Sequence, residues 1–296
     1  MVAQTAFGIP FACARRFAEL TEPASDAPEG ASVSIEWRDI PARLVHPTGR
    51  ESWWQTTHDA YLLHVPGVAG FHVTAGTIAV QPEAGADDAA VRLYLFGSVM
   101  GALLHLRDRL PLHGSAVHLL RQDVAAIFTG MSTAGKSTLA AALAGRGYRL
   151  MADDIAALDP HPGGILLQPG LAHSKLWRRS LDFLALDPAG GKLVRPDKYA
   201  LPMPVAPAPA RVGFVYELHF GEAVALTEVV GMEKLRLLDR QTFRRNYVHG
   251  FGRSGAHLQR LAALAGQVRT CRITRPPGET MTVDAIIDLL ERDWAG

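Results

Sequence analysis

The segment between residues 130 and 137 contains the residue types that bind a phosphate group. It reads Gly130-Met131-Ser132-Thr133-Ala134-Gly135-Lys136-Ser137 and matches the pattern G-x-x-x-x-G-K-S/T. Glycines let backbone N–H groups curl around a phosphate that a side chain would otherwise exclude. We therefore predict that a nucleotide binds to the loop formed by Gly130, Met131, Ser132, Thr133, Ala134, Gly135, Lys136, Ser137 and Thr138.

Two side chains at the end of this loop extend the prediction to ATP and Mg²⁺. Lys136 is expected to reach the β- and γ-phosphates, and the Ser137 hydroxyl is expected to bind Mg²⁺. The helix that begins there adds the positive end of its dipole to the same anion. The alternative is a glycine turn with a solvated lysine. An apolar strand before the loop and an alanine-rich helix after it favour the phosphate site.

A pair of carboxylates, Asp153 and Asp154, follows the predicted strand Tyr148 to Met151. In a parallel α/β sheet the carboxyl ends of the strands meet at one edge, so the pair is expected near the bound phosphates. One aspartate could help hold Mg²⁺, and the other could accept a proton from an attacking hydroxyl. By itself such a pair is as often a turn or a helix cap. Next to the loop, the chemical role is the better interpretation.

The elements that must position these residues alternate between strand and helix, which indicates an α/β layer fold. Around the loop we predict a strand at 124–128, a helix at 136–144 and a strand at 148–151. Downstream, strands at 212–220 and 223–230 are predicted to form a hairpin through the two-residue turn Gly221-Glu222. The remaining predictions are helices at 234–245, 257–265 and 283–294, a strand at 268–274, and a proline-rich connector at 202–209.

The first part of the chain has a different pattern. The stretches 32–45 and 61–80 are rich in Val, Ile, Thr and aromatic residues, which predicts short antiparallel strands. We therefore divide the chain into a small β-rich N-terminal domain (1–88) and a catalytic domain (89–296), with a linking helix at 89–109. The apolar run 93–106 is too short to cross a hydrocarbon layer of about 30 Å, so we expect a packed helix.

The composition narrows the class of protein. The chain has 296 residues, 48% of them hydrophobic, and a net charge of +1, which argues against nucleic-acid binding and disorder. Cys13 and Cys271 are far apart in the sequence, so neither a disulfide framework nor a zinc site is indicated. The N-terminus has no export signal. We expect a cytoplasmic protein without a membrane or nucleic-acid partner.

Three successive segments resemble the catalytic domain of HPr kinase/phosphorylase: Leu112 to Val117, the loop Gly130 to Thr138, and Arg146 to Asp154. The segments Gln168-Pro169-Gly170 and Lys175-Leu176-Trp177 make the sequence most similar to the HPr-kinase-like proteins of lasso-peptide biosynthesis. The resemblance is specific over about the middle third of the chain.

The resemblance implies a P-loop core of the phosphoenolpyruvate-carboxykinase type. It places His113 near the phosphates, assigns Asp153 as the acid/base that deprotonates a serine hydroxyl, and leaves Asp154 to support the metal or the loop. In the lasso-peptide relatives the acceptor is the C-terminal serine of the precursor peptide, so the same role is implied here. HPr kinases assemble as hexamers, which implies a homo-oligomer.

The sequence also departs from the family. HPr kinases carry a Glu-x-Arg-Gly-x-Gly segment that supplies a metal-site glutamate. Here residues 167–177 stand in its approximate place, with Gln168 as the nearest polar residue. This departure argues mildly against HPr itself as the substrate. Two alternatives stay open: a kinase of an HPr-like carrier protein, and a regulatory protein that binds ATP without transferring phosphate.

Further candidates are basic or lone polar residues. Lys175, Lys192 and Arg195, with Lys198 nearby, could contact the transferred phosphate or the acceptor. Most basic clusters are only solvated surface, and that is the alternative here. His113, taken alone, could be a hydrogen-bonded core residue, and only the resemblance favours a place near the phosphates.

Overall fold

The computed structural model describes residues 1–23, 32–277 and 282–295. The chain forms two compact units, Met1–Pro111 with Thr242–Arg260, and Leu112–Gln241 with Leu261–Gly296. The predicted boundary between residues 88 and 89 therefore falls inside the first unit. That unit also includes the predicted linking helix and a second chain segment, 242–260, that the sequence placed in the catalytic domain.

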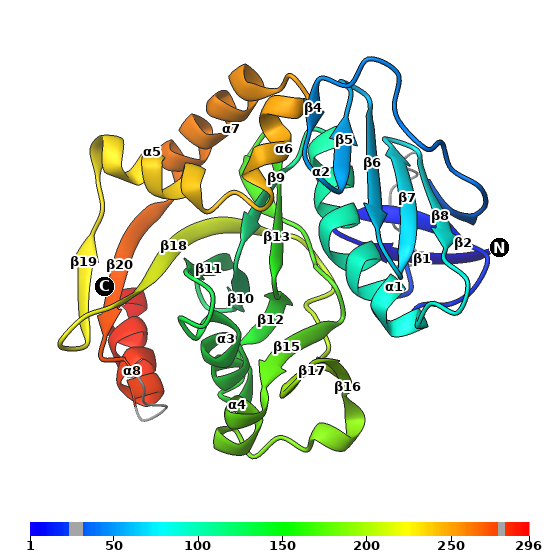
Figure 1. The fold of residues 1–296 in the computed structure, drawn as a ribbon. Helices are drawn as coiled ribbons and strands as arrows, with labels where there is room; N and C mark the ends of the chain where they lie inside the picture. The colour runs from blue at the N-terminus through cyan, green and yellow to red at the C-terminus, as the bar shows by residue number, and fades with distance from the viewer. Residues whose placement is uncertain (24–31, 278–281, 296) are drawn as a thin grey trace. The chain divides into compact units, whose positions relative to one another are not determined.

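The first unit contains an eight-stranded sheet (Figure 1). Its strands, in spatial order, are β1 (Val2–Ala6), β2 (Ile9–Cys13), β3 (Val33–Trp37), β8 (Thr77–Pro82), β7 (Ala69–Thr74), β6 (Ala60–Val65), β5 (Trp54–Thr56) and β4 (Gly49–Arg50). The prediction of an antiparallel domain was wrong at one place, because β3 runs parallel to both β2 and β8. Of the predicted stretch 32–45, only β3 is a strand. The polar and proline-containing residues after Trp37 account for its early end.

One long apolar helical run follows this sheet. It comprises α1 (Asp88–Tyr94), a π-helical turn η1 (Leu95–Val99) and α2 (Met100–Leu106), and Asp87 caps its start through a hydrogen bond to the N–H of Ala89. By length and composition, the helix Asp88–Leu106 could cross a membrane, but 67% of its most apolar stretch is buried inside the protein. The prediction of a packed helix is confirmed by these buried side chains. This unit also contains the short helix α6 (Arg245–Gly250) and the first part of α7 (Ser254–Gln267).

The second unit is built on a nine-stranded mixed sheet. Its main path runs β12 (Arg149–Ala152), β10 (Ser115–Leu119), β11 (Val124–Gly130), β18 (Ala210–Phe220), β14 (Gly164–Leu167), β13 (Ile155–His161) and β9 (Leu110–His113). β20 (Arg269–Arg275) also pairs with β18, and β19 (Ala225–Glu228) pairs with β20. The predicted hairpin between residues 212 and 230 was wrong, because β20 lies between β18 and β19 in the sheet.

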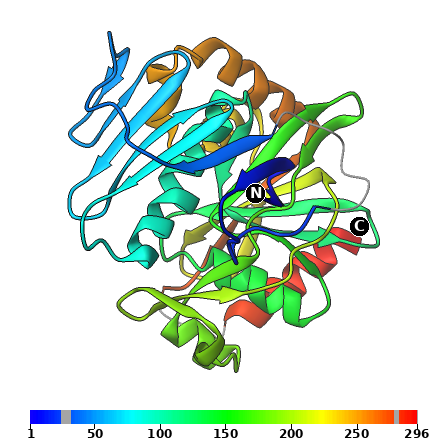
Figure 2. The ribbon, with the colours of Figure 1, turned by 90° about the vertical axis from the view of Figure 1, so that its right-hand side faces the viewer.

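Two helices cover one face of this sheet, α3 (Lys136–Gly145) and α8 (Thr282–Ala295), as Figures 1 and 2 show. Small residues such as Ala140 let α3 approach the strands closely, and Trp294 of α8 is buried in the same hydrophobic cluster. Two other helices that include residues of this unit are α5 (Gly231–Arg240) and α7 (Ser254–Gln267), and the boundary between the two units falls inside α7.

A separate three-stranded sheet branches from the second unit. Its order is β15 (His173–Trp177), β17 (Lys198–Pro202) and β16 (Lys192–Arg195), and all its pairings are antiparallel. α4 (Arg178–Phe183) and the 3₁₀ turn η2 (Pro188–Gly190) connect β15 to β16. Residues 203–209, most of the predicted proline-rich connector, join β17 to β18 without helix or strand.

Candidate active site

The glycine-rich loop leads from the end of β11 to the start of α3. Its backbone turns through positive φ angles at Gly130 (128°), Thr133 (68°) and Gly135 (99°), a region that favours glycine. A Cβ atom at Gly130 would lie only 2.5 Å from the carbonyl oxygen of Leu218 on the neighbouring β18. The loop can therefore follow this path only if its first residue lacks a side chain.

The side chain of Lys136 folds back over this loop. Its ammonium donates hydrogen bonds to the carbonyl oxygens of Gly130 (2.9 Å) and Met131 (3.0 Å), and the residue is 6% exposed. Burial lowers the pKa of Lys136, although the carboxylates of Asp153 and Asp154 oppose that shift. The ammonium thus lies inside the loop and within the electrostatic reach of both aspartates.

Asp153 is a buried carboxylate that accepts three hydrogen bonds. Ser115 Oγ donates at 2.5 Å, Ser174 Oγ at 3.0 Å and the backbone N–H of Lys175 at 2.7 Å. The residue itself is 2% exposed. Sequence reasoning named Asp153 but missed both serine donors, of which Ser115 lies within the segment that carries the family resemblance.

Asp154 is the more accessible carboxylate, with a side chain 27% exposed and a backbone φ of 72°. Lys175 Nζ donates to its Oδ2 at 2.8 Å. His113 Nδ1 lies 3.4 Å from its Oδ1 and 3.0 Å from its backbone oxygen. Burial by itself would raise the pKa of Asp154, but the Lys175 ammonium and, in the acid range where this carboxyl titrates, the protonated His113 ring outweigh burial and hold the pKa well below its usual value. Asp154 is therefore ionised at neutral pH.

The pKa of His113 is also lowered, which for a histidine favours the neutral form. Burial and the nearby Lys136 ammonium lower the pKa of His113, and Asp154 only partly compensates. Its ring is therefore largely neutral at neutral pH, and it can exchange hydrogen bonds without carrying a permanent charge.

The strand order explains why these residues meet. β10 runs antiparallel to both β11 and β12, so β11 and β12 run in the same direction with β10 between them. The ends of β11 and β12 and the start of β10 therefore share one edge of the sheet, which holds Gly130, Asp153 and Ser115. The predicted parallel sheet was wrong in detail, because an antiparallel strand separates the two parallel ones, but the carboxylates still lie beside the loop.

Of the basic residues on the small three-stranded sheet, some lie near the two aspartates and others are exposed to solvent. Lys198 of β17 contacts the face of Trp177 at 5.5 Å from the ring centroid. Burial lowers the pKa of Lys198, while Asp154 and Asp153 act in the opposite direction, so Lys198 lies within reach of the carboxylate pair. Lys192 and Arg195, both named from sequence, have exposed side chains on β16, and Arg195 pairs with Lys198 in the sheet register.

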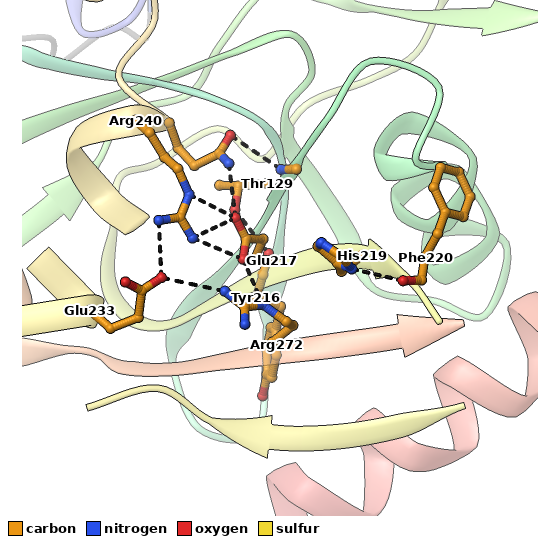
Figure 3. A network of polar contacts seen from close by, with 10 residues as sticks. Thr129, Tyr216, Glu217, His219, Phe220, Glu233, Arg240 and Arg272 are labelled. Carbon is orange, nitrogen blue, oxygen red and sulfur yellow. Dashed lines mark hydrogen bonds and ion pairs between the residues drawn. The ribbon is translucent and has the colours of Figure 1, made fainter. Parts of the chain in front are cut away.

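A second polar network supports the start of the loop from the other side (Figure 3). Glu217 of β18 is buried and accepts hydrogen bonds from Arg240 at 3.0 Å and Arg272 at 2.9 Å. Gln241 Nε2 donates to Glu217 at 3.2 Å, and its Oε1 accepts from the N–H of Gly130 at 3.3 Å. No local pattern in the sequence identifies this network, because its members come from three distant segments.

Two further contacts fix the outer part of the loop. Arg275 at the end of β20 donates to the carbonyl oxygen of Ala134 from Nε at 3.1 Å and from Nη2 at 2.8 Å. The Thr138 hydroxyl, predicted to contact the nucleotide, lies 2.8 Å from the buried Ser180 hydroxyl of α4.

The donors available for a divalent cation are few. Among residues 1–23, 32–277 and 282–295 there is no group of three or more His, Cys, Asp or Glu side chains placed to hold a metal ion. Mg²⁺ commonly binds through one or two carboxylates together with substrate phosphates and water. The ionised Asp154 and the partly exposed Ser137 hydroxyl fit such a shared site better than an all-protein cage.

Comparisons with known proteins leave the family open. No family model matches the chain, and no curated protein matches it. Among solved structures, the chain is similar to the HPr(Ser) kinase/phosphatase from Coxiella burnetii, with a TM-score of 0.33, 11% sequence identity, and coverage of 63% of this chain and 99% of that chain. A TM-score this low carries no argument about function, which must rest on the residues of the site itself.

Proposed function

We propose that this chain is a Mg²⁺-ATP-dependent kinase that transfers the γ-phosphoryl group to a serine hydroxyl of a peptide. One observation carries the proposal: a glycine-rich loop with a buried lysine and a pair of aspartates share one edge of the sheet. The loop offers amides and an ammonium to a triphosphate, and the carboxylates offer a proton acceptor beside it.

In this proposal the loop amides and Lys136 hold the phosphates, with the N-terminus of α3 directed at the same charge. Ser137 and Asp154 would hold Mg²⁺, which would neutralise part of the charge on the phosphates. Lys175 and His113 flank Asp154 and would stabilise the negative charge that spreads over the transferred group.

Asp153 is proposed to act as the base. The serine hydroxyl of the acceptor passes its proton to a carboxylate oxygen of Asp153 while its own oxygen bonds to the γ-phosphorus, and the bond to the β-phosphate oxygen breaks to release ADP. Asp153 Oδ1 accepts from Ser115 Oγ alone, whereas Oδ2 accepts two hydrogen bonds, so the acceptor hydroxyl can approach Oδ1 without displacing a donor or replace a donor at Oδ2. The bond from Ser174 Oγ, at 3.0 Å, is the longest of the three and therefore the easiest to exchange.

The sequence resemblance favours a ribosomally made peptide with a C-terminal serine, such as a lasso precursor peptide, as the acceptor. The other two candidates are an HPr-like carrier protein and a regulatory role in which ATP is bound but not used for transfer. We also propose a cytoplasmic location and association into homo-oligomers, both on the resemblance and composition alone.

Mass spectrometry of candidate acceptors incubated with the protein, ATP and Mg²⁺ separates these possibilities. We expect a serine-terminated peptide to gain one phosphoryl group. Lys136→Ala should lose transfer and nucleotide binding while its circular dichroism spectrum stays unchanged. Asp153→Asn should still bind ATP but transfer about 10²- to 10⁴-fold more slowly, as for loss of a general base.

The matched control is Asp123→Asn, which neutralises an exposed carboxylate just before β11, at the opposite end of that strand from the loop. It should transfer at the parental rate. Transfer that persists in Lys136→Ala would overturn the proposal. ATP binding without phosphorylation of any peptide or carrier would favour the regulatory alternative instead.

A further inference from the structure

We infer that the purine base of the bound nucleotide stacks on Phe220, at the carboxyl end of β18. This inference rests on the proposed function, because it assumes that the loop binds the phosphates of ATP. It adds what the sequence left open, namely on which side of the loop the base lies and which side chains contact it.

The direction of the nucleotide follows from the order of the strands. Along the edge that holds the site, β12 and β10 lie on one side of β11, and β18 and β20 lie on the other. Asp153, the proposed base, follows β12 and accepts a hydrogen bond from Ser115 of β10, so the reacting end of the triphosphate points to that side. The nucleoside at the other end of the triphosphate must then extend over the ends of β18 and β20, since ligands of such sheets bind beyond the carboxyl ends of the strands.

The side chains at the ends of these two strands suit a base. Phe220 is the last residue of β18, its side chain is exposed although large and apolar (38%), and it pairs with Arg275, the last residue of β20. The Arg275 guanidinium lies 5.0 Å from the centroid of the Phe220 ring. Figure 3 shows Phe220 beyond His219, past the end of the Glu217 network. One face of the ring is thus supported by a cation, and the residue keeps accessible surface for a second planar group.

A chain of contacts connects this ring to the phosphate-binding loop. Arg275 donates two hydrogen bonds to Ala134 in the loop while it covers Phe220. Met131, the second residue of the loop, is 71% exposed and follows directly on Gly130, which pairs with Leu218 of β18. Phe220 and Met131 therefore lie at the ends of adjacent parallel strands, so a base that extends from the loop toward β18 meets apolar surface.

Calorimetric titration with two probes tests the inference. MgATP carries a base, and Mg-tripolyphosphate carries the phosphates without one. We expect Phe220→Ala to weaken MgATP binding about tenfold to a hundredfold, the range for loss of one base–aromatic stack, and to leave tripolyphosphate binding unchanged. Phe220→Trp should restore MgATP binding, because it keeps an aromatic surface.

The control is Leu120→Ala, which removes an exposed apolar side chain (50%) from the turn after β10, at the opposite edge of the sheet. It should bind both probes like the parent chain. The inference is overturned if Phe220→Ala binds MgATP with parental affinity, or if it loses both probes equally, since Phe220 would then support the loop rather than the base. If the parent chain binds neither probe, it is the proposed function that fails.

Discussion

His105 gives the first unit a stability that should fall steeply in mild acid. It lies in α2, is 4% exposed, and its Nε2 is 2.8 Å from the carbonyl oxygen of Phe243, to which it donates as a neutral ring. Burial lowers the pKa of His105 from 6.5 to about 4, and the hydrogen bond to Phe243 offsets only part of that shift. The cations Arg253 and Arg260 lower it further.

The size and sign of the effect follow from linkage between protonation and folding. Because the pKa of His105 is lower in the folded state, the unfolded chain takes up the proton first as the pH falls through 6.5. Each pKa unit corresponds to about 1.4 kcal/mol, so the shift from 6.5 to about 4 removes about 3 kcal/mol of stability between pH 7 and pH 4. The titration of His105 thus costs no stability above pH 6.5 and destabilises the fold progressively between pH 6.5 and about 4.

Chemical denaturation of the parent chain and of His105→Gln at several pH values measures this contribution. Glutamine keeps an N–H donor for Phe243 but does not titrate. The difference in unfolding free energy between the two proteins should therefore shift by about 3 kcal/mol in favour of the variant as the pH falls from 7 to 4. Other groups titrate in both proteins and cancel in the difference. A difference that stays constant over this range would show that the buried imidazole does not resist protonation.

Two further predictions concern the site. Gly130→Ala should lower the unfolding free energy by about 1–3 kcal/mol and abolish nucleotide binding, because its Cβ would lie 2.5 Å from the backbone oxygen of Leu218; Gly145→Ala, with no atom within 4 Å of its Cβ, should do neither when both are tested by denaturation and calorimetry. Lys175→Met should destabilise the protein by about 1–3 kcal/mol at pH 7, since it removes the cation that donates a hydrogen bond to the partly buried Asp154 carboxylate. Because the pKa of Asp154 is lowered in the folded state, that deficit should shrink as the pH falls below 3.8, and a deficit that grows in acid would contradict the assignment.

The parts of the fold that could be predicted are those with local signals. The buried run of β11, the loop glycines and the alanines of α3 are neighbours in sequence, so strand, loop and helix could be read in order. The pairing of β10 with β12 and the insertion of β20 between β18 and β19 could not, because these partners lie far apart in the chain. Local turn chemistry at Gly221-Glu222 therefore predicted a hairpin that non-local pairing replaced.

The residues of the candidate site also differ in how far the sequence could predict them. Asp153 could be named from its position after a strand, but its donors Ser115 and Ser174 are 38 and 21 residues away, and neither residue type nor spacing identifies them as its partners. Lys175 was one of several basic candidates, and only the structure singles it out as the partner of Asp154. Lys192, chosen on the same grounds, is exposed on β16. Charge type alone could not separate a lysine that neutralises a carboxylate from one that faces water.

The three hydrogen bonds of Asp153 have one more consequence. Ser115 belongs to the nine-stranded sheet, whereas Ser174 and Lys175 belong to the small one. The Asp153 carboxylate therefore links the two sheets through hydrogen bonds. If the proposed acceptor hydroxyl replaced a donor at this carboxylate, the link between the two sheets would weaken, and the position of β15 with Lys175 would change. Binding of the acceptor and movement of that lysine would then be coupled.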